Sequence, residues 1–272
     1  MDLTEPPENL PISANLLDLR LNNIEILNEL AFSGLSELAS LHLDLNSIMT
    51  IRQGAFRGLK NLIYLYLSNN QIRKVYPNSA MILPNPKQVG KSKRYLEPGC
   101  FDDLISLSYL HMDHNEIAYL PMGIFRPITG LYDLQLQNNL LKDWKLGYFR
   151  ESSRVRKLNL NNNMIEKLPD YGFVGLEGLV TLEIRNNSLT EFSPAFNRKF
   201  HLSGVPWFMN ILELKRCTRL YLNDNNIESL EAVYDKNTIL CEIDLSNNAI
   251  DRVHPEFTTN LKVRMNPRSG KL

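Results

Sequence analysis

The stretch Leu62 to Ile72, "LIYLYLSNNQI", decides the fold, because its pattern returns along most of the chain. Leucines alternate with other residues over a few positions, so they would point to one face of a short strand. An asparagine follows, where the backbone has to turn. The pattern L-x-x-L-x-L-x-x-N-x-I has nine copies, the first beginning with Ala14 in place of leucine. Every copy keeps the asparagine: Asn22, Asn46, Asn70, Asn115, Asn139, Asn163, Asn187, Asn225 and Asn248.

A second marker gives the length of the unit. A phenylalanine lies fourteen residues before the asparagine in six copies, and Tyr234 holds that place before Asn248. In the regular copies the next phenylalanine follows the asparagine after ten residues, so the unit has 24 residues. The phenylalanines are Phe32, Phe56, Phe101, Phe125, Phe149 and Phe173. They lie far from the strand in sequence, and we expect them to fill the opposite half of each coil.

One such strand cannot bury its apolar face alone, but stacked units share a continuous core. The repeats therefore predict an α/β solenoid, mostly parallel β, with an irregular or short helical convex side. The asparagine amide has two donors and an acceptor, enough to satisfy turn groups of its own coil and the next. We expect the nine asparagines to form a structural ladder without a chemical role.

One unit is too long. From Asn70 to Phe101 is 31 residues where ten is the rule, so 21 residues are extra. Joining "RKV" to "EPGCF" restores a regular unit, which places the insertion at Tyr76 to Leu96. This segment has three lysines, an arginine, three prolines and no acidic residue, and should form a surface loop. It is either a basic loop that contacts an anionic partner, or a bulge or alternative-transcript insertion without a binding role.

A second irregularity lies between Phe196 and Asn225, which are 29 residues apart where fourteen is the rule. Two registers compete. Asn210 lies fourteen residues after Phe196, but only fifteen residues then remain to Asn225, fewer than a coil needs. We favour an insertion near 197–216, with Cys217 leading the next repeat. No composition break marks a second domain, so we expect one solenoid over residues 1–272 with about nine repeats.

These copies resemble leucine-rich repeat proteins of the 24-residue "typical" kind, from about Leu10 to Phe257. The resemblance implies a horseshoe-shaped solenoid with a parallel sheet on its concave side, and this repeat type is found mostly in secreted and cell-surface proteins. The stretch Glu8 to Ile24, "ENLPISANLLDLRLNNI", resembles the first repeat of small leucine-rich proteoglycans of the decorin type. Their cysteine caps are not in this sequence, so we expect a fragment or truncated isoform.

Composition argues against several classes of protein. The 272 residues include 30 Lys plus Arg and 30 Asp plus Glu, and the resulting net charge of zero argues against a nucleic-acid partner. No apolar run reaches the length of a membrane span, about 18 residues. The start, "MDLTEPPEN", lacks the basic and apolar regions of a signal peptide. If the protein is secreted, we expect that its amino-terminal part was cleaved or lies outside this sequence.

Cysteines and one sequon complete the chemical inventory. Cys100, Cys217 and Cys241 are an odd number and cannot close into a complete disulfide framework. We expect all three to be buried free thiols. A disulfide between Cys217 and Cys241 is the alternative. The sequon Asn186-Asn187-Ser188 is a glycosylation signal in a secreted protein. Asn186 precedes the ladder asparagine and should be exposed, so it is the expected site of glycosylation.

Function in such a scaffold would lie on the strand positions between the leucines. Neighbouring strands are about 4.8 Å apart, so side chains at one position on successive repeats touch. Five aromatic side chains on three successive repeats should therefore form one patch, edged by two aspartates. The aromatic patch is His42, Tyr64, Tyr66, Tyr109 and His111, and the aspartates are Asp44 and Asp113. Aromatic residues with polar tips are favoured at interfaces, so we predict a binding site here. The alternative is that they only suit an exposed strand, since tyrosine is a good strand former.

Catalysis and metal binding have little support. His42 and His111 are expected two strands apart, roughly 10 Å, too far to share a metal at ligand distances of about 2.1 Å. No nucleophile elbow, phosphate loop or zinc spacing occurs in the sequence. We predict no catalytic residue, no metal, no cofactor and no enzyme activity.

The sequence leaves three interpretations of function. The first is an extracellular or secreted protein-binding scaffold, for which the resemblance implies a matrix protein such as collagen, a growth factor or a receptor as partner. The second is a fragment of a leucine-rich repeat receptor ectodomain. The third is a cytoplasmic scaffold, which the unpaired cysteines and the missing leader favour slightly.

Overall fold

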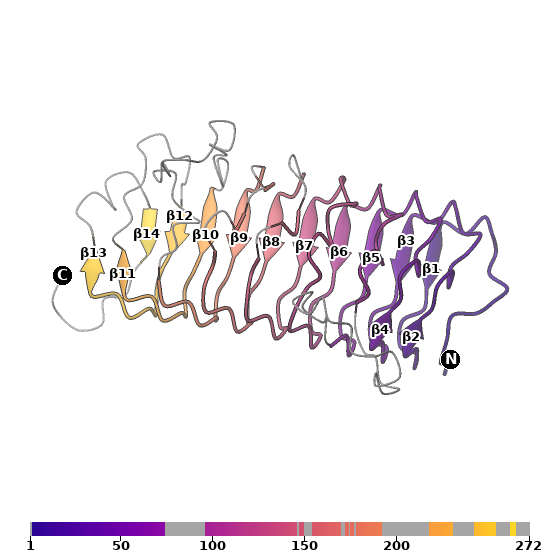
Figure 1. Cartoon of the computed structure of the whole chain (residues 1–272), viewed down its shortest axis with the longest axis horizontal. Coiled ribbons are helices and arrows are strands. Elements are labelled where there is room, and N and C mark those ends of the chain that lie inside the picture. The colour runs from indigo at the N-terminus through magenta and orange to yellow at the C-terminus, as the bar shows by residue number, and fades with distance from the viewer. Residues whose placement is uncertain are drawn as a thin grey trace, which may run out of the picture. The chain divides into compact units, whose positions relative to one another are not determined.

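The computed structural model describes residues 2–73, 96–145, 147–149, 154–169, 172–173, 175–176, 178–191, 218–230, 242–253 and 262–264. It comprises two compact units, unit 1 (residues 1–140) and unit 2 (residues 141–272), each of which is described by itself. In both, a strand of three residues alternates with turns, coil after coil (Figure 1). That all 272 residues form a single domain stays a prediction.

Unit 1 is built on a parallel sheet in which successive repeats supply neighbouring strands. The strands are β1 (Leu16–Asp18), β3 (Ser40–His42), β5 (Tyr64–Tyr66), β6 (Tyr109–His111) and β7 (Asp133–Gln135). Equivalent positions of the repeat lie opposite one another, as Leu65 does to Leu41 and to Leu110. On the return side of the coils, β2 (Ile26–Leu27) and β4 (Thr50–Ile51) form a short parallel pair.

Unit 2 has the same plan. Its sheet contains β8 (Lys157–Asn159), β9 (Thr181–Glu183), β10 (Arg219–Tyr221), β12 (Glu242–Asp244) and β14 (Lys262–Arg264). On the return side, β11 (Ser229–Leu230) pairs with β13 (Arg252–Val253). The predicted fold class, a mostly parallel β solenoid, is confirmed, and in the described residues the return side consists of turns and two-residue strands. Within the described ranges no helix is long and apolar enough to cross a membrane.

The core follows from the alternation of the strand residues. Leu41, Leu65 and Leu110 are fully buried, while the residues on either side of each are partly exposed. Away from the sheet, one phenylalanine per coil continues the packing: Phe56 stacks on Phe32 and on Phe101, with 6.0 Å between ring centroids in each case. Each coil is therefore held to the next on both sides of the core.

The asparagine ladder joins each coil to the one before it. The side-chain amide of Asn70 donates to the carbonyls of Leu43 (3.0 Å) and Leu67 (3.1 Å), and its oxygen accepts the N–H of Ile48 (2.9 Å). The same three bonds are made by Asn46, Asn115 and Asn139 in unit 1 and by Asn225 and Asn248 in unit 2. Asn163 and Asn187 accept the equivalent backbone N–H groups of Leu141 and Ile165. All eight are buried, so the ladder pairs turn groups that have no access to water.

Asn22, the first asparagine, is only partly buried because no complete coil precedes it in the described structure. Its side-chain oxygen accepts the N–H of Leu3 (3.1 Å), and the carbonyl of Leu3 accepts the N–H of Asn23 (2.8 Å). Leu3 thus makes with Asn22 and Asn23 the hydrogen bonds that Ile24 makes with Asn46 and Ser47 of the next coil. Leu3 therefore supplies to the first asparagine the backbone contacts that a repeat supplies to the later ones.

The predicted insertion requires a correction at its end. Leu96, its expected last residue, is fully buried and forms a parallel bridge with Ile51, as Ile51 does with Leu27. The next residue, Glu97, donates its N–H to the Ile51 carbonyl (2.9 Å). Leu96 is therefore a scaffold residue, and the 21 extra residues precede it. Valine and leucine both suit the buried position that precedes Glu97. The sequence pattern therefore could not distinguish Val75 from Leu96, and the predicted end of the insertion was one residue too late.

Both irregular segments lie largely outside the described residues, namely 74–95 and 192–217. The sheet is nevertheless continuous past each of them, because Tyr64 lies opposite Tyr109 and Thr181 opposite Arg219. The N–H of Leu189 donates to the side-chain oxygen of Asn225 (3.0 Å), so Asn225 continues the ladder from Asn187 in unit 2. Cys217 and Cys241 lie outside the described residues, and Cys100 is a buried free thiol.

Candidate binding surface

The aromatic patch stands on the open face of the unit 1 sheet, opposite the buried leucines. Each strand alternates, so the burial of Leu65 sends Tyr64 and Tyr66 to the same open face. Strands β3 and β6 do the same for His42, Tyr109 and His111. The register then places equivalent positions side by side: His42 is opposite Tyr66, and Tyr66 is opposite His111. The structure thus brings all five residues together.

The rings of the patch touch one another in two rows. In the first row, Tyr66 stacks on His42 with 4.6 Å between centroids and meets His111 edge to face at 5.0 Å. In the second row, Tyr64 stacks on Tyr109 at 4.8 Å. Tyr64 and Tyr66 connect the rows with 6.4 Å between their centroids. The patch is therefore one continuous aromatic layer over three strands.

Tyr66 is less exposed than its strand position suggests. Tyr64 keeps 37% of its surface exposed, whereas Tyr66 is partly buried between the two histidines. This burial raises the pKa of the Tyr66 hydroxyl above its ordinary value, and the neighbouring Tyr64 adds to the effect. The hydroxyl consequently stays a neutral donor and acceptor. The alternation of the strand predicts the face on which Tyr66 lies. It does not predict how much of the Tyr66 side chain its neighbours bury.

The two aspartates of the patch are linked through one serine. Asp44 accepts the N–H of Ser68 (3.0 Å), and the Ser68 hydroxyl donates to Asp113 (2.6 Å). The other oxygen of Asp113 lies 2.8 Å from Nδ1 of His114. Burial raises the pKa of Asp44, and the nearby Asp113 acts in the same direction, while the bond from Ser68 opposes it. We call Asp44, Ser68 and Asp113 the acidic edge of the patch.

One further tyrosine joins the patch that sequence reasoning missed. Tyr132 lies 6.0 Å from Tyr109 between ring centroids and is exposed. It directly precedes β7 and therefore falls outside the three strand positions from which the patch was predicted. An aromatic residue next to Asp133 in the sequence is the only signal that could have drawn attention to it.

Comparison with known proteins identifies the repeats. The family model described as "Leucine rich repeat" matches residues 36–85 and 129–189. The repeats of these two stretches are leucine-rich repeats. Among solved structures it is similar to a leucine-rich repeat protein of Leptospira interrogans, with a TM-score of 0.59 and 20% sequence identity over 92% of this chain. The match spans 59% of the length of that protein, and the likeness shows the fold. No curated protein matches the sequence.

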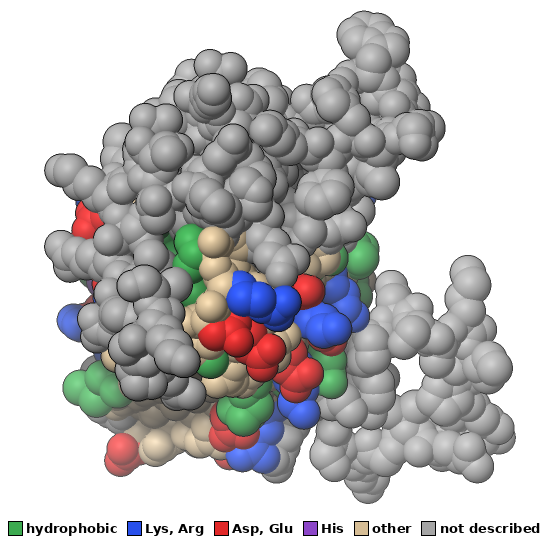
Figure 2. Space-filling view, turned by 90° about the vertical axis from the view of Figure 1, so that its left-hand side faces the viewer, with side chains coloured by type: hydrophobic (Ala, Val, Ile, Leu, Met, Phe, Trp, Pro, Cys, Tyr) green, Lys and Arg blue, Asp and Glu red, His purple; other side chains and the backbone are tan. Residues whose placement is uncertain are grey.

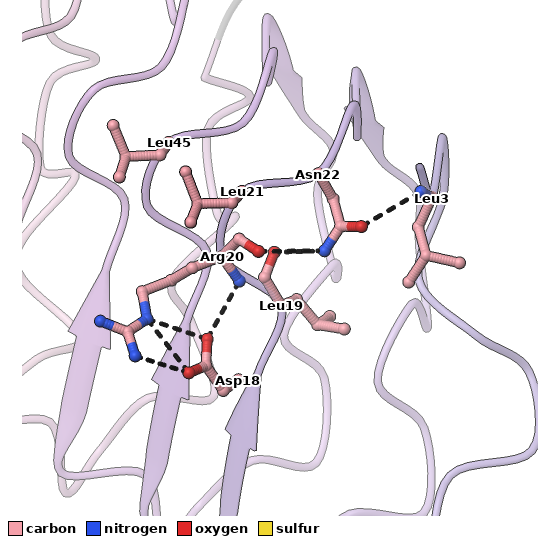
Figure 3. Close-up of a pocket in the computed structure, with 7 residues that line it drawn as sticks. All are labelled: Leu3, Asp18, Leu19, Arg20, Leu21, Asn22 and Leu45. Carbon is pink, nitrogen blue, oxygen red and sulfur yellow. Dashed lines mark hydrogen bonds and ion pairs between the residues drawn. The ribbon is translucent and has the colours of Figure 1, made fainter. Parts of the chain in front are cut away.

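A second surface feature lies at the first repeats, a cavity of about 490 Å³. Leu21 and Leu45 line it, beside an ion pair in which Arg20 donates to Asp18 at 2.6 Å (Figure 3). Both leucines have a left-handed φ of 57°, which costs an ordinary side chain energy, and they are 70% and 47% exposed. Later repeats of unit 1 have other residues in this place: Asn69, His114 and Asn138.

The open face of unit 2 is a network of polar contacts. Asn161 donates to Glu183 (2.9 Å), and the guanidinium of Arg185 lies 4.2 Å from the centre of the Tyr221 ring. Figure 2 views the structure from the side of β11 to β14, where basic and acidic side chains lie next to one another. Asn186, the expected glycosylation site, is exposed, and its amide donates to Asn162 (2.9 Å). Its modification stays a prediction.

Chemically, the patch offers stacking and hydrogen bonding. The ring of Tyr66 separates His42 from His111, because it contacts both. In the part of the chain that the structure describes, no three His, Cys, Asp or Glu side chains are grouped to hold a metal ion. A preorganised aromatic surface with carboxylates at one edge is instead suited to hold part of another macromolecule.

Proposed function

We propose that this leucine-rich repeat protein is a non-enzymatic protein-binding scaffold and that the aromatic patch of unit 1 is its contact surface. The core is complete without these side chains, because leucines, asparagines and phenylalanines supply it. Exposed aromatic residues are therefore not required by the scaffold. Tyrosine and histidine combine a large apolar area with a polar tip, which is the composition of interface anchors.

The observation that carries the proposal is the continuous contact between rings over β3, β5 and β6. Side chains that are already held by their neighbours lose little conformational freedom when a partner binds. Residues at the centre of such surfaces commonly contribute ~2 kcal/mol or more to affinity. Tyr66 occupies that position, since it contacts both histidines and Tyr64.

We place the protein outside the cell, with a matrix protein such as collagen, a growth factor or a receptor as its partner. The 24-residue repeat and the likeness of Glu8 to Ile24 to the first repeat of small leucine-rich proteoglycans support this. The exposed Asn186 in its sequon agrees with it. A fragment of a receptor ectodomain, or a cytoplasmic scaffold, are the alternatives. Expression with a secretion leader in mammalian cells, with Asn186→Gln as control, tests whether the sequon is used.

The test of the binding surface is a screen of purified extracellular matrix proteins, growth factors and receptor ectodomains by biolayer interferometry. We expect a partner whose affinity falls at least ~10-fold on Tyr66→Ala. Tyr221→Ala is the matched control, because Tyr221 has the same position in its strand of unit 2. A partner that binds wild type and Tyr66→Ala equally well would show that the contact surface lies elsewhere.

A further inference from the structure

We infer that the aromatic patch takes an arginine-bearing segment of its partner, with the guanidinium group at the acidic edge beside Tyr66. This rests on the proposed function, because it names the chemistry of the partner at the same surface. Each residue of the acidic edge comes two positions after a strand that carries a ring of the first row, so one side chain can reach both. Ser68 follows Tyr66 by two residues and lies on the same face of the sheet.

The charge on this face is one-sided. The face positions of β3, β5, β6 and β7, together with the positions two residues after each strand, include the carboxylates of Asp44, Asp113 and Asp133 and no Lys or Arg. Arg20, two residues after β1, donates hydrogen bonds of 2.6 to 3.1 Å to Asp18. A cationic partner is therefore favoured over a neutral or acidic one.

The two carboxylates of the acidic edge converge on one serine. Ser68 donates its N–H to Asp44 and its hydroxyl to Asp113, which holds both groups in place before any partner arrives. Burial raises the pKa of Asp44 and the nearby Asp113 adds to this, while the hydrogen bond from Ser68 and the neighbouring His42 oppose it. In the same row, the buried side-chain oxygen of Gln137 has no hydrogen-bond partner in the described part of the chain. The carboxylate oxygens of the acidic edge and the side-chain oxygen of Gln137 can therefore accept further hydrogen bonds from a partner that brings donors.

Arginine fits this arrangement better than lysine. A guanidinium group is planar and has five N–H donors, so it can bond two carboxylates at once while lying against an aromatic ring. The phenol oxygen of Tyr66 and the imidazoles beside it offer further acceptors and a flat apolar surface. An ammonium group has three donors and is more strongly hydrated, so it gains less here.

The experiment compares two synthetic peptides that differ in one side chain. Each is a flexible Gly-Ser octapeptide, one with a central arginine and one with citrulline, which has nearly the same shape but no charge. Two-dimensional NMR of the full chain follows the titration of each peptide. We expect the arginine peptide to bind at least ~10-fold more tightly than the citrulline peptide, with shifts at His42, Tyr66 and His111.

Variants separate this inference from the proposed function. In the double variant Asp44→Asn with Asp113→Asn, the amide oxygens can still accept the bonds of Ser68, so the fold is kept while the charge is removed. We expect the preference for arginine to disappear in it and to stay in Asp224→Asn, an exposed aspartate of unit 2. Thermal melts check the fold of each variant.

Three results would overturn the inference. They are equal affinity for arginine and citrulline, an arginine preference that survives the double variant, and no shift with the arginine peptide up to about 5 mM. If a protein partner from the screen still depends on Tyr66 in those cases, the proposed function stands and only the arginine chemistry is wrong. If that partner is indifferent to Tyr66, the proposed function fails as well.

Discussion

The imidazole of His42 stacks on the ring of Tyr66, with 4.6 Å between their centroids and 29° between their planes. The two residues are 24 positions apart in the chain, one full repeat, and lie opposite one another in β3 and β5. The contact makes Tyr66 part of a packed row rather than a free surface side chain. A substitution there changes the neighbouring rings as well as the surface that a partner would meet.

Replacing Tyr66 by alanine should weaken a partner's binding at least ~10-fold and should also cost some stability. Contacts between aromatic rings contribute ~0.5–1.5 kcal/mol each beyond area burial, so a loss of about 1 kcal/mol in unfolding free energy is expected. Affinity and urea unfolding of the same preparations measure the two effects. Asp244→Ala, at the equivalent position of β12 in unit 2, should change little in either assay. Unchanged affinity for Tyr66→Ala would direct attention to the basic segment before Leu96.

Asn139→Leu should lower the unfolding free energy by roughly 1–3 kcal/mol, because it leaves buried backbone groups without partners. Its side chain accepts the N–H of Ile117 (3.0 Å) and donates to the carbonyls of Met112 and Leu136 (3.0 Å each). Chemical denaturation measures the change. Asn226→Leu is the control, since Asn226 is exposed in unit 2. Equal stability of wild type and Asn139→Leu would mean that the ladder contributes nothing to unit 1.

Deleting residues 75–95 should give a protein of equal or higher stability. Loop closure depends only weakly on loop length, and Leu96 keeps its bridge to Ile51. By contrast, Leu96→Ala in the full chain should cost ~2–5 kcal/mol, as for other buried leucines. Thermal and urea unfolding compare the two proteins. A deletion variant that fails to fold would show that the segment belongs to the core.

Leu45→Asn should raise the unfolding free energy by up to ~1 kcal/mol. Leu45 has a φ of 57°, and asparagine adopts this left-handed conformation more readily than leucine. An asparagine there could also bond along the row, as Asn186 does with Asn162 in unit 2. Leu43→Asn is the contrast, because Leu43 is fully buried and the change should destabilise unit 1. A clear loss of stability in Leu45→Asn would mean that contacts of the leucine outweigh the backbone strain.

Two aspartates of unit 1 should show opposite pH dependence. Burial raises the folded-state pKa of Asp44, so the folded state holds its proton longer than the unfolded state. Its contribution to stability is therefore present below the unfolded pKa, near 3.9, and is lost as the pH rises through the folded pKa. Asp44→Asn should then be at least as stable as wild type at pH 7, with a smaller advantage near pH 3.

The hydrogen bond from Arg20 lowers the pKa of Asp18 to about 2. Its contribution is present above the unfolded pKa and is lost as the pH falls toward the folded value. Asp18→Asn should therefore be slightly less stable than wild type at pH 7, and the effect should be small because the pair is exposed. Unfolding measured from pH 3 to pH 7 tests both variants. Parallel curves for Asp44→Asn and Asp18→Asn would contradict the assigned signs.

The sequence alone determined the repeat, the residues of the ladder and the fold class. These depend on local rules: alternation buries Leu41, Leu65 and Leu110, and an asparagine after the strand serves the turn. A constant period then places equivalent positions side by side, which is why His42, Tyr66 and His111 could be predicted as neighbours. The order of the strands in the sheet also follows from the sequence, because each coil contacts only the coils beside it.

The tertiary structure decided what depends on side-chain packing and on pairing between distant segments. Val75 and Leu96 are equivalent by residue type, and only the bridge to Ile51 selects Leu96. The link from Asp44 through Ser68 to Asp113 depends on side-chain orientations that a repeat pattern does not specify. The burial of Tyr66 likewise depends on how the rings of His42 and His111 are oriented against it. A periodic sequence fixes which positions are adjacent, whereas contact distances and burial depend on how all the side chains of a surface pack together.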